Sequence, residues 1–347
     1  MGKLHMECLC LWLFSLSPMV RDLILEGEDF QMSTAAVPKK KMTKQRKLML
    51  LKDNLELYSL FIPAFVVIAI YCYAPLFGYV IAFQDYMPGA SFFGRGIKWV
   101  GFKHFIDFYE GPFFKRLMVN TIWLSFLNLV WGFWVPIVFA LLLNEVNVMG
   151  YKKFIQTASY LPYFISMVVM CGMLISFLSP NGLINKLIVA LGGQAKAWRN
   201  IPSVFPEIYV LSNIWKGFGF NSILYISVIT SIDTSMYESA RLDGANRLQM
   251  AIHITIPSIV PTIAIMLIMA VGSLLNANTD FILLMYVPGT YSKADVIGTY
   301  IYRQLTESAG KSFSFTTAVG LIQSVINFLL VVITNAISDK LTGAGLF

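Results

Sequence analysis

Long apolar runs constrain this chain more than any other feature. Six stretches are each long enough to cross the hydrocarbon core of a bilayer, which takes about 20 helical residues. The predicted spans are Tyr58–Ala82, Thr121–Leu143, Phe154–Phe177, Ile208–Ile232, Ile259–Leu283 and Thr317–Ile337. Each must be helical, because lipid offers no partner for backbone N–H and C=O groups. The sequence therefore predicts an all-α membrane protein with six transmembrane helices.

The charge distribution predicts how these spans are oriented. Charged residues make up only 13% of the chain, against about 25% in a soluble domain. The net charge is +7, and the densest basic cluster, Lys39–Lys52, directly precedes the first span. Basic residues beside a span favour the cytoplasmic side, so we expect a cytoplasmic N-terminus and, after six crossings, a cytoplasmic C-terminus. Basic and aromatic residues do not interleave as in nucleic-acid-binding proteins, so no nucleic-acid partner is expected.

The same pattern divides the chain into three parts. We predict a basic cytoplasmic arm at residues 1–56, a six-helix transmembrane domain at 57–338 and a short cytoplasmic tail at 339–347. Two readings of the arm stay open. Either residues 1–31 belong to the protein, or translation begins at Met32, which opens an ordinary polar, basic stretch before a first membrane helix.

The loop between the fourth and fifth spans, residues 233–258, carries strong local signals. Ser235 and Glu238 have the Ser-x-x-Glu spacing of a capping box, which predicts that a short helix starts there. Gly244 then permits the left-handed turn that ends such a helix.

A second helix is predicted after this turn. Asn246 and Gln249 are spaced to cap its start, and Pro257 is expected to end it before the fifth span begins. The loop should thus form a helix–turn–helix on the cytoplasmic surface. On amphipathicity alone, an interfacial connector between two spans is the better interpretation.

The order of residues in this loop favours a more specific interpretation. It resembles the EAA coupling loop of permease subunits in binding-protein-dependent ABC importers, which reads Glu-Ala-Ala, Asp-Gly-Ala and then Ile-x-Leu-Pro. The matching positions here are Glu238, Ser239, Ala240, Asp243, Gly244, Ala245, Ile254 and Pro257. Ser239 replaces the alanine that follows the glutamate and Ile256 replaces leucine, both small changes. The resemblance implies a type I ABC importer permease fold whose loop docks into a separate ATPase.

The resemblance runs from about Lys52 to Phe347 and is closest to the oligosaccharide subfamily, with its maltose-type and polysaccharide-type permeases. Segments 85–121, 275–303 and 313–347 carry it. It implies a multi-pass protein of the cell membrane that imports a sugar or oligosaccharide. The implied partners are a second permease, an ABC ATPase dimer and an extracytoplasmic sugar-binding protein. No cofactor is expected on this chain, since ATP and Mg²⁺ would bind the ATPase.

Polar groups inside the spans are candidates for the substrate pathway, because they usually face a cavity or the bundle interior. They are Asn213, Trp215, Lys216, Asn221, Asn276, Asn278 and Asp280. Each has a plainer alternative: an interhelical hydrogen bond for the asparagines, core packing or an interfacial anchor for Trp215, and snorkelling or a pair with Asp280 for Lys216. Relatives often have Gly-Phe, an acidic residue and Gln after Leu-Asn-Ala, where this chain continues with Asn278-Thr279-Asp280. If this region lines the pathway, a cargo different from that of the commoner relatives is expected.

Other site types find no support in the sequence. Gly310-Lys311-Ser312 ends like a P-loop, but position 305 is Leu where the motif needs glycine. The cysteines and histidines lack metal-ligand spacing, and no catalytic set stands out, so neither a metal site nor an enzyme is predicted. An ion-gradient-driven secondary transporter remains the main alternative; it explains the spans but not the loop. An amino-acid or metal importer remains an alternative within the same family.

Overall fold

The computed structural model of the chain describes residues 59, 61–87, 89–94, 96–306 and 313–342. The predicted N-terminal arm, with its two possible starts, lies outside these residues, as does the tail beyond Thr342. The described residues fall into two compact units. One holds residues up to 81 together with 91–97. The other, called the larger unit below, holds Ala82–Ala90 and residues 98–342.

The first unit is dominated by residues 61–81 of the helix Phe61–Phe83, which matches the predicted first span. It starts as an α-helix, widens to a π-helix at η1 (Ala69–Tyr73) and tightens to a 3-10 helix at η2 (Ala74–Phe83). Pro75 lies at this change, and a proline cannot donate to the carbonyl four residues earlier. The altered winding accommodates that missing donor.

The regular elements of the larger unit's described residues are all helices. Its elements are α4 (Lys103–Tyr109), α5 (Phe114–Asn144), α6 (Met149–Phe164), α7 (Met167–Leu178), α8 (Leu183–Ala190), η3 (Trp198–Asn200), η4 (Pro202–Val204), α9 (Phe205–Thr230), α10 (Thr234–Leu242), α11 (Arg247–Met250), η5 (Ala251–Thr255), α12 (Ile256–Gly272), α13 (Thr279–Met285), η6 (Pro288–Thr290), α14 (Tyr291–Ala294), α15 (Ile297–Thr306) and α16 (Phe313–Thr342). Extended pairing among these residues is limited to an isolated bridge between Gln84 and Trp99. The all-α prediction is confirmed.

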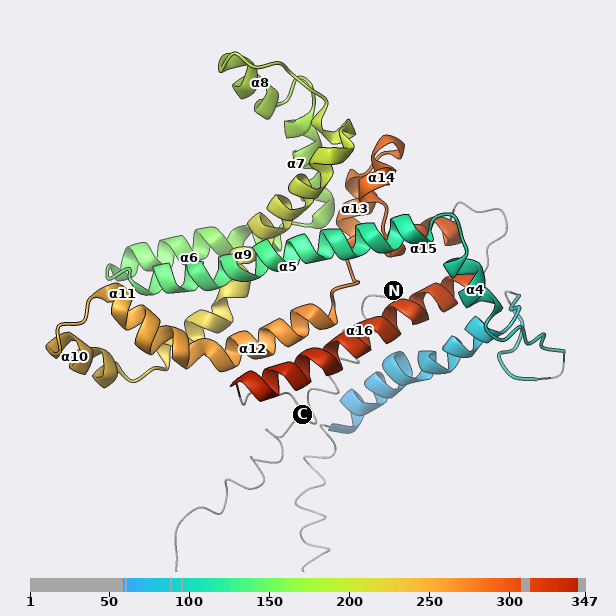
Figure 1. Cartoon of the computed structure of the whole chain (residues 1–347), viewed down its shortest axis with the longest axis horizontal. Helices are drawn as coiled ribbons and strands as arrows, with labels where there is room; N and C mark the ends of the chain where they lie inside the picture. The colour runs from blue at the N-terminus through green and yellow to red at the C-terminus, as the bar shows by residue number, and fades with distance from the viewer. Residues whose placement is uncertain (1–58, 60, 88, 95, 307–312, 343–347) are drawn as a thin grey trace, which may run out of the picture. The chain divides into compact units, whose positions relative to one another are not determined.

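Three apolar clusters hold the larger unit together. Helix α9 runs beside α5 and α6, and α12 runs beside α16 (Figure 1). One cluster joins α7, α9 and α13 around Tyr209 and Phe281. A second joins α5, α9 and α12 around Tyr225 and Ile259, and a third lies around Phe108 where α4, α5, α15 and α16 meet. Helix α9 therefore contributes to two of the three clusters.

The long helices leave most of their apolar surface uncovered. Five are long and apolar enough to cross a membrane: Phe61–Phe83, Phe114–Asn144, Met167–Ala190, Arg247–Gly272 and Phe313–Lys340. At most 22% of the most apolar stretch of any of them is buried within the chain. Such an apolar surface is stable only against lipid or another apolar protein surface.

Two of the predicted spans were expected to be single helices, and this prediction is wrong. The third, Phe154–Phe177, is divided between α6 and α7, because Ile165 and Ser166 adopt extended backbone conformations. Ser166 caps the new helix by accepting from the Val169 N–H at 3.3 Å. The fifth, Ile259–Leu283, is divided between α12 and α13 by an unwound segment at 273–278.

The fourth predicted span, Ile208–Ile232, corresponds to α9. This helix has 26 residues but is not among the five candidates, because its polar side chains lower its hydropathy. It is nonetheless embedded in the larger unit between α5, α6 and α12.

Gly219 allows α9 to approach α6 closely. A Cβ atom at this position would collide with the backbone carbonyl of Ser159. We expect Gly219→Ala to separate these helices and lower the amount of monodisperse protein in detergent several-fold, as fluorescence-detected gel filtration would measure. Gly320→Ala in α16 is the matched control, since nothing lies within 4 Å of a Cβ there. Equal yields for the two variants would contradict the close-packing role of Gly219.

Candidate functional site

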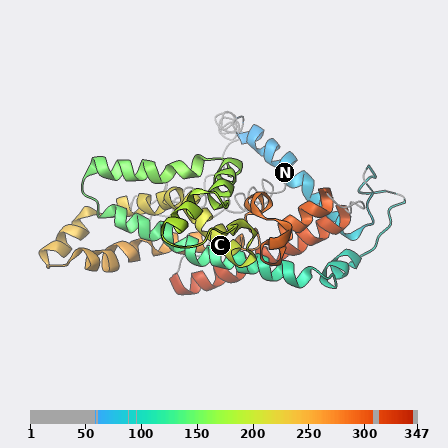
Figure 2. The ribbon, with the colours of Figure 1, turned by 90° about the horizontal axis from the view of Figure 1, so that it is seen from above.

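The loop at 233–258 folds as two short helices joined by a turn, at one end of the larger unit (Figures 1 and 2). Its first helix, α10, starts at Thr234 and not at the predicted Ser235 box. Asp233 is the cap, because its carboxylate accepts from the Ser235 N–H at 2.9 Å. Hydrogen bonds from the Ser235 backbone and side chain lower the pKa of the Asp233 carboxyl. The predicted helix is confirmed, but its capping residue was wrong.

The turn after α10 matches the prediction. Gly244 has φ +80°, a left-handed conformation that disfavours any residue with a Cβ. The Ala245 N–H donates to the Ala240 carbonyl at 2.9 Å, and the Gly244 N–H donates to the Arg241 carbonyl at 3.1 Å. This pair of bonds is the Schellman arrangement, which satisfies carbonyls that the end of a helix leaves open.

The second helix begins as predicted but does not end as predicted. The Gln249 N–H donates to Asn246 Oδ1 at 2.9 Å, and the Asn246 N–H donates to Gln249 Oε1 at 2.8 Å, which completes a capping box. Pro257 was expected to end this helix, but α11 runs through the π-helical η5 into α12 without a break. The wider π turn accommodates the missing Pro257 donor, so proline falls inside one continuous helix.

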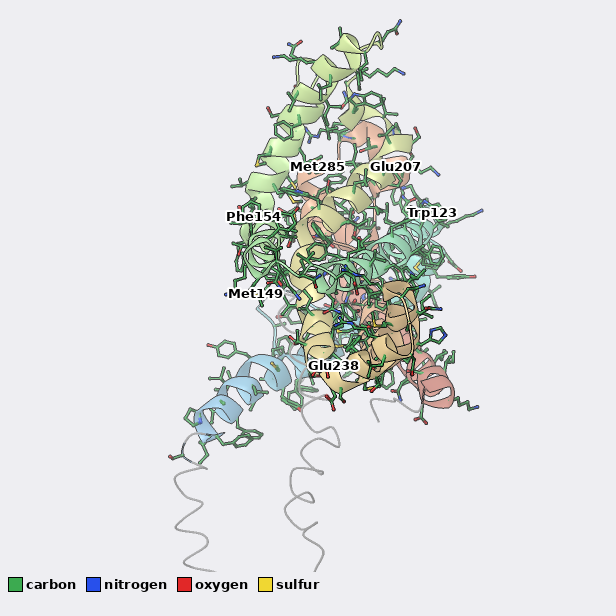
Figure 3. The ribbon with its side chains drawn as sticks, turned by 90° about the vertical axis from the view of Figure 1, so that its left-hand side faces the viewer. Trp123, Met149, Phe154, Glu207, Glu238 and Met285 are labelled. Atoms are coloured by element: carbon green, nitrogen blue, oxygen red, sulfur yellow. The ribbon has the colours of Figure 1, made fainter. Side chains whose placement is uncertain are left out.

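An open hollow of about 340 Å³ lies beside the turn between the two helices. It is lined by Ala240, Asp243, Gly244, Ala245, Gln249, Met250, His253 and Ile254. Five of the eight predicted loop residues are in this lining, whereas Glu238, Ser239 and Pro257 are not. Figure 3 views the chain from this end and shows Glu238 on α10. The hollow is large enough to take apolar side chains of another protein.

Sequence reasoning missed two contacts of this loop, one that joins its two halves and one to the neighbouring helix α5. Tyr237 Oη lies 2.9 Å from Thr255 Oγ1, so α10 is hydrogen-bonded to η5. Arg247 lies 3.7 Å from the carboxylate of Glu145, at the end of α5. Neither pair forms a spacing pattern that the sequence alone displays.

The unwound segment between α12 and α13 is held by side-chain amides. Gln323 Nε2 donates to the Leu275 carbonyl at 2.6 Å and to Asn276 Oδ1 at 2.8 Å. Asn327 accepts from the Leu275 N–H at 3.1 Å and donates to Asn276 Oδ1. Such partners are needed because unwound backbone inside a membrane protein has no water to bond. Gln323 and Asn327 were not predicted; polar residues in an otherwise apolar span were the available signal.

The other end of this segment is bonded to α9. The Asn278 N–H donates to the Tyr209 hydroxyl at 2.9 Å, and Asn278 Nδ2 donates to Asn213 Oδ1 at 2.9 Å. Asn278 also caps α13 by accepting from the Phe281 N–H. The interhelical hydrogen bonds predicted as the alternative for the asparagines are therefore confirmed for Asn213, Asn276 and Asn278.

Lys216, one helical turn further along α9, forms hydrogen bonds with the backbone at the break between α6 and α7. Its ammonium donates to the carbonyls of Pro162 and Tyr163, at 3.4 and 3.1 Å, and to that of Ile165. Helix α6 ends here, so these carbonyls lack the N–H that the next turn of a helix would offer, although that of Pro162 also accepts from the Ile165 N–H at 3.2 Å. The three donors are thereby used, so the predicted pairing of Lys216 with Asp280 is wrong.

The remaining pathway candidates lie apart from these networks. Trp215 is 42% exposed, which excludes full core packing within this chain. Asn221 is exposed on α9, and Asp280 is exposed in the first turn of α13, where a helix start favours negative charge.

Replacing Lys216 with Met should loosen the α6–α7 break. The aliphatic chain would be kept, but three carbonyls would lose a charged donor, each hydrogen bond to a charged group being worth about 1.5–3 kcal/mol. We expect faster amide exchange over residues 162–169 in the purified protein. Lys186→Met on the exposed side of α8 is the control, and equal exchange in both variants would contradict the role of Lys216.

A second polar cluster lies at the other end of the larger unit and was not predicted. Asp295 is fully buried and accepts from Arg116 at 2.9 Å and from Arg303 at 2.8 Å. Its other oxygen accepts from the Thr299 hydroxyl at 2.9 Å. Burial lowers the pKa of Arg303, but hydrogen bonds with Asp295 and Tyr286 outweigh this and raise that pKa above its ordinary value. The cluster ties α5 to the start of α15.

The family model described as "binding-protein-dependent transport system inner membrane component" matches residues 59–343. The chain is 36% identical over 313 residues to the polygalacturonan/rhamnogalacturonan transport system permease protein YteP of Bacillus subtilis (strain 168), covering 90% of this chain and 96% of that protein. It is 38% identical over 299 residues to protein LplB of the same organism, covering 86% and 92%.

Two solved structures are similar over a comparable length. One is the crystal structure of a bacterial ABC transporter involved in the import of the acidic polysaccharide alginate. It has a TM-score of 0.77 and 39% sequence identity, and the match covers 86% of this chain and 99% of that chain. The other is the crystal structure of the bacterial alginate ABC transporter in complex with an alginate pentasaccharide-bound periplasmic protein. It has a TM-score of 0.77 and 39% sequence identity, and the match covers 85% of this chain and 98% of that chain. The resemblance indicated by the loop is confirmed.

Proposed function

Because the chain belongs to the family of binding-protein-dependent transport system inner membrane components, we propose that it is the membrane-spanning permease subunit of an ATP-driven importer. The observation that carries the proposal is the match at residues 59–343, which includes the loop and both helix breaks. The chain is a multi-pass membrane protein, and its relatives are transport permeases rather than enzymes.

The cargo proposed is an oligosaccharide derived from a polysaccharide. The relatives named for a cargo support this: one is a polygalacturonan/rhamnogalacturonan permease, and one belongs to an alginate importer. A complex of that importer with an alginate-loaded periplasmic protein supports delivery by an extracytoplasmic binding protein. In this proposal the chain pairs with a second permease, and together they enclose the pathway.

The proposed topology has six crossings with both termini in the cytoplasm. Helix α9 supplies the crossing that hydropathy alone does not identify, because its polar groups are used in hydrogen bonds inside the larger unit. The loop at 233–258 then faces the cytoplasm, and the polar residues around the two helix breaks lie within the membrane. Asn213, Trp215, Lys216, Asn221, Asn276, Asn278 and Asp280 are the proposed pathway residues, and of these Trp215, Asn221 and Asp280 are exposed.

The proposed coupling element is the loop itself. A partner ATPase, which would carry the ATP and Mg²⁺, docks at the hollow beside Gly244. Because α11, η5 and α12 form one continuous helix, a displacement of the loop is passed directly into a membrane helix. ATP binding would bias the transporter toward one state through contacts made only in that state. Glu238, Ser239, Ala240, Asp243, Gly244, Ala245, Ile254 and Pro257 are the proposed coupling residues.

The ion-gradient-driven alternative gains no support from the family to which the chain belongs. The two proposals differ in what they require. An importer of this kind needs an ATPase and a binding protein, whereas a secondary transporter needs only an ion gradient and this chain.

Reconstitution separates them. The chain is co-expressed with a candidate second permease, ATPase and binding protein, and the purified complex is placed in liposomes. Uptake of labelled oligogalacturonate, oligoalginate and malto-oligosaccharide is measured with and without internal ATP. ATP-dependent uptake that also needs the binding protein supports the proposal. Uptake that persists without ATPase and follows an imposed ion gradient would establish the alternative.

A further inference from the structure

We infer that Tyr237 is a positioning residue, which fixes the angle between α10 and the helix that continues into the membrane. This inference rests on the proposed coupling function of the loop. Tyr237 projects from α10 and Thr255 from η5, and their hydroxyl oxygens lie 2.9 Å apart. Neither residue belongs to the glutamate, glycine and proline positions that mark the loop in the sequence.

Packing does not hold α10 in place. None of its residues, Thr234–Leu242, is buried in this chain. Its cap at Asp233 and its closing turn at Gly244 are local bonds, which define the helix but leave its direction free. Within 229–260, where every residue is described, the Tyr237–Thr255 bond is the side-chain hydrogen bond that joins α10 to the helix beyond the turn.

Thr255 is a firm attachment point for this bond. It is 3% exposed and is the last residue of the π-helical turn that precedes α12. A threonine in a helix commonly bonds the carbonyl one turn back. Ser258, one turn later, does so by donating to the Ile254 carbonyl at 2.7 Å. The Thr255 hydroxyl is directed to α10 instead, so the bond links two helices.

The π turn explains why the bond forms at this position. Pro257 has no N–H to offer the His253 carbonyl, and the helix widens over Ala251–Thr255 around this gap. A π turn also rotates the following side chains relative to those before it. In this arrangement Pro257, the η5 turn and Tyr237 act together: the proline widens the helix, and the hydroxyl pair fastens α10 to the widened turn.

The first test needs only this chain in lipid nanodiscs. Amide hydrogen exchange over α10 is compared for wild type, Tyr237→Phe, Thr255→Val and the double variant. Loss of one hydrogen bond is expected to raise the α10 exchange rate about fivefold. The double variant should exchange no faster than either single variant, because both remove the same bond. Ser258→Ala, which removes a hydroxyl bonded within its own helix, should leave α10 exchange unchanged.

The second test measures coupling in the reconstituted complex. Tyr237→Phe and Thr255→Val should each lower the oligosaccharide transported per ATP hydrolysed about fivefold, while basal hydrolysis and assembly stay at wild-type levels. Unchanged α10 exchange in Tyr237→Phe would overturn the bond's role, and raised exchange with an unchanged transport-to-ATP ratio would overturn the positioning role. Absence of ATP-dependent uptake in the wild type is a different result, which counts against the proposed function itself.

Discussion

Gly244→Asp is expected to abolish ATP-driven uptake while the chain still assembles in the membrane. At φ +80° a side chain costs about 1–2 kcal/mol of backbone strain. The Asp side chain would also occupy the open side of Gly244, where nothing lies within 4 Å, and so reduce the hollow in which we propose the ATPase docks. The measurement is oligosaccharide uptake and stimulated ATP hydrolysis by the reconstituted complex.

Gly192 supplies the matched control for this prediction. It has φ +85° and equally open surroundings, but it lies in the loop between α8 and η3 rather than in the loop at 233–258. Gly192→Asp therefore introduces the same strain and charge away from the proposed docking surface. Uptake should be retained in Gly192→Asp. If both variants lost uptake equally at equal assembly, strain rather than docking would be the cause.

The largest loss of stability is expected for Asp295→Ala. Two guanidinium groups, of Arg116 and Arg303, would then share a buried site without a counter-charge. Arg116 Nε and Arg303 Nη1 already lack hydrogen-bond partners among the described residues, so the cluster has no spare acceptor. Breaking a buried ion pair from one side costs about 3–5 kcal/mol. We expect the apparent melting temperature in detergent to fall by about 10 °C.

Asp85→Ala is the control for this effect. Asp85 pairs with Lys98 at 3.3 Å, but the two side chains are 51% and 75% exposed. A surface pair of this kind contributes about 0–1 kcal/mol, so the melting temperature should shift by at most about 2–3 °C. Asp295→Asn keeps the shape of the side chain and loses its charge, so it should lower the melting temperature by an amount between those of Asp295→Ala and Asp85→Ala. Similar shifts for Asp295→Ala and Asp85→Ala would show that the buried cluster is not a stabilising one.

The sequence was informative where local chemistry decides the structure. The Gly244 turn and the Asn246–Gln249 capping box depend on residues a few positions apart, and both were predicted correctly. Apolar length also located the first, second and sixth spans, because a bilayer selects helices by length and composition.

The sequence was misleading where distant residues decide it. Apolar length predicted one continuous helix at Ile259–Leu283, yet the unwound segment is stable because Gln323 and Asn327 on α16 bond its backbone. Pro257 was expected to end a helix, but a π turn accommodates it. The Asp295 cluster joins residues 8 and 179 positions apart, a pairing that no spacing rule reveals.

Side chains of helix α9 form hydrogen bonds with both helix breaks, the one between α12 and α13 and the one between α6 and α7. Tyr209, Asn213 and Lys216 follow one another at helical spacing; the first two hold the Asn278 end of one break and the third holds the carbonyls of the other. A twist of α9 about its axis would therefore strain both sets of bonds together. The two helix breaks should therefore change conformation together. A substitution at any of the three positions should disturb both breaks, including the one that the substituted residue does not contact.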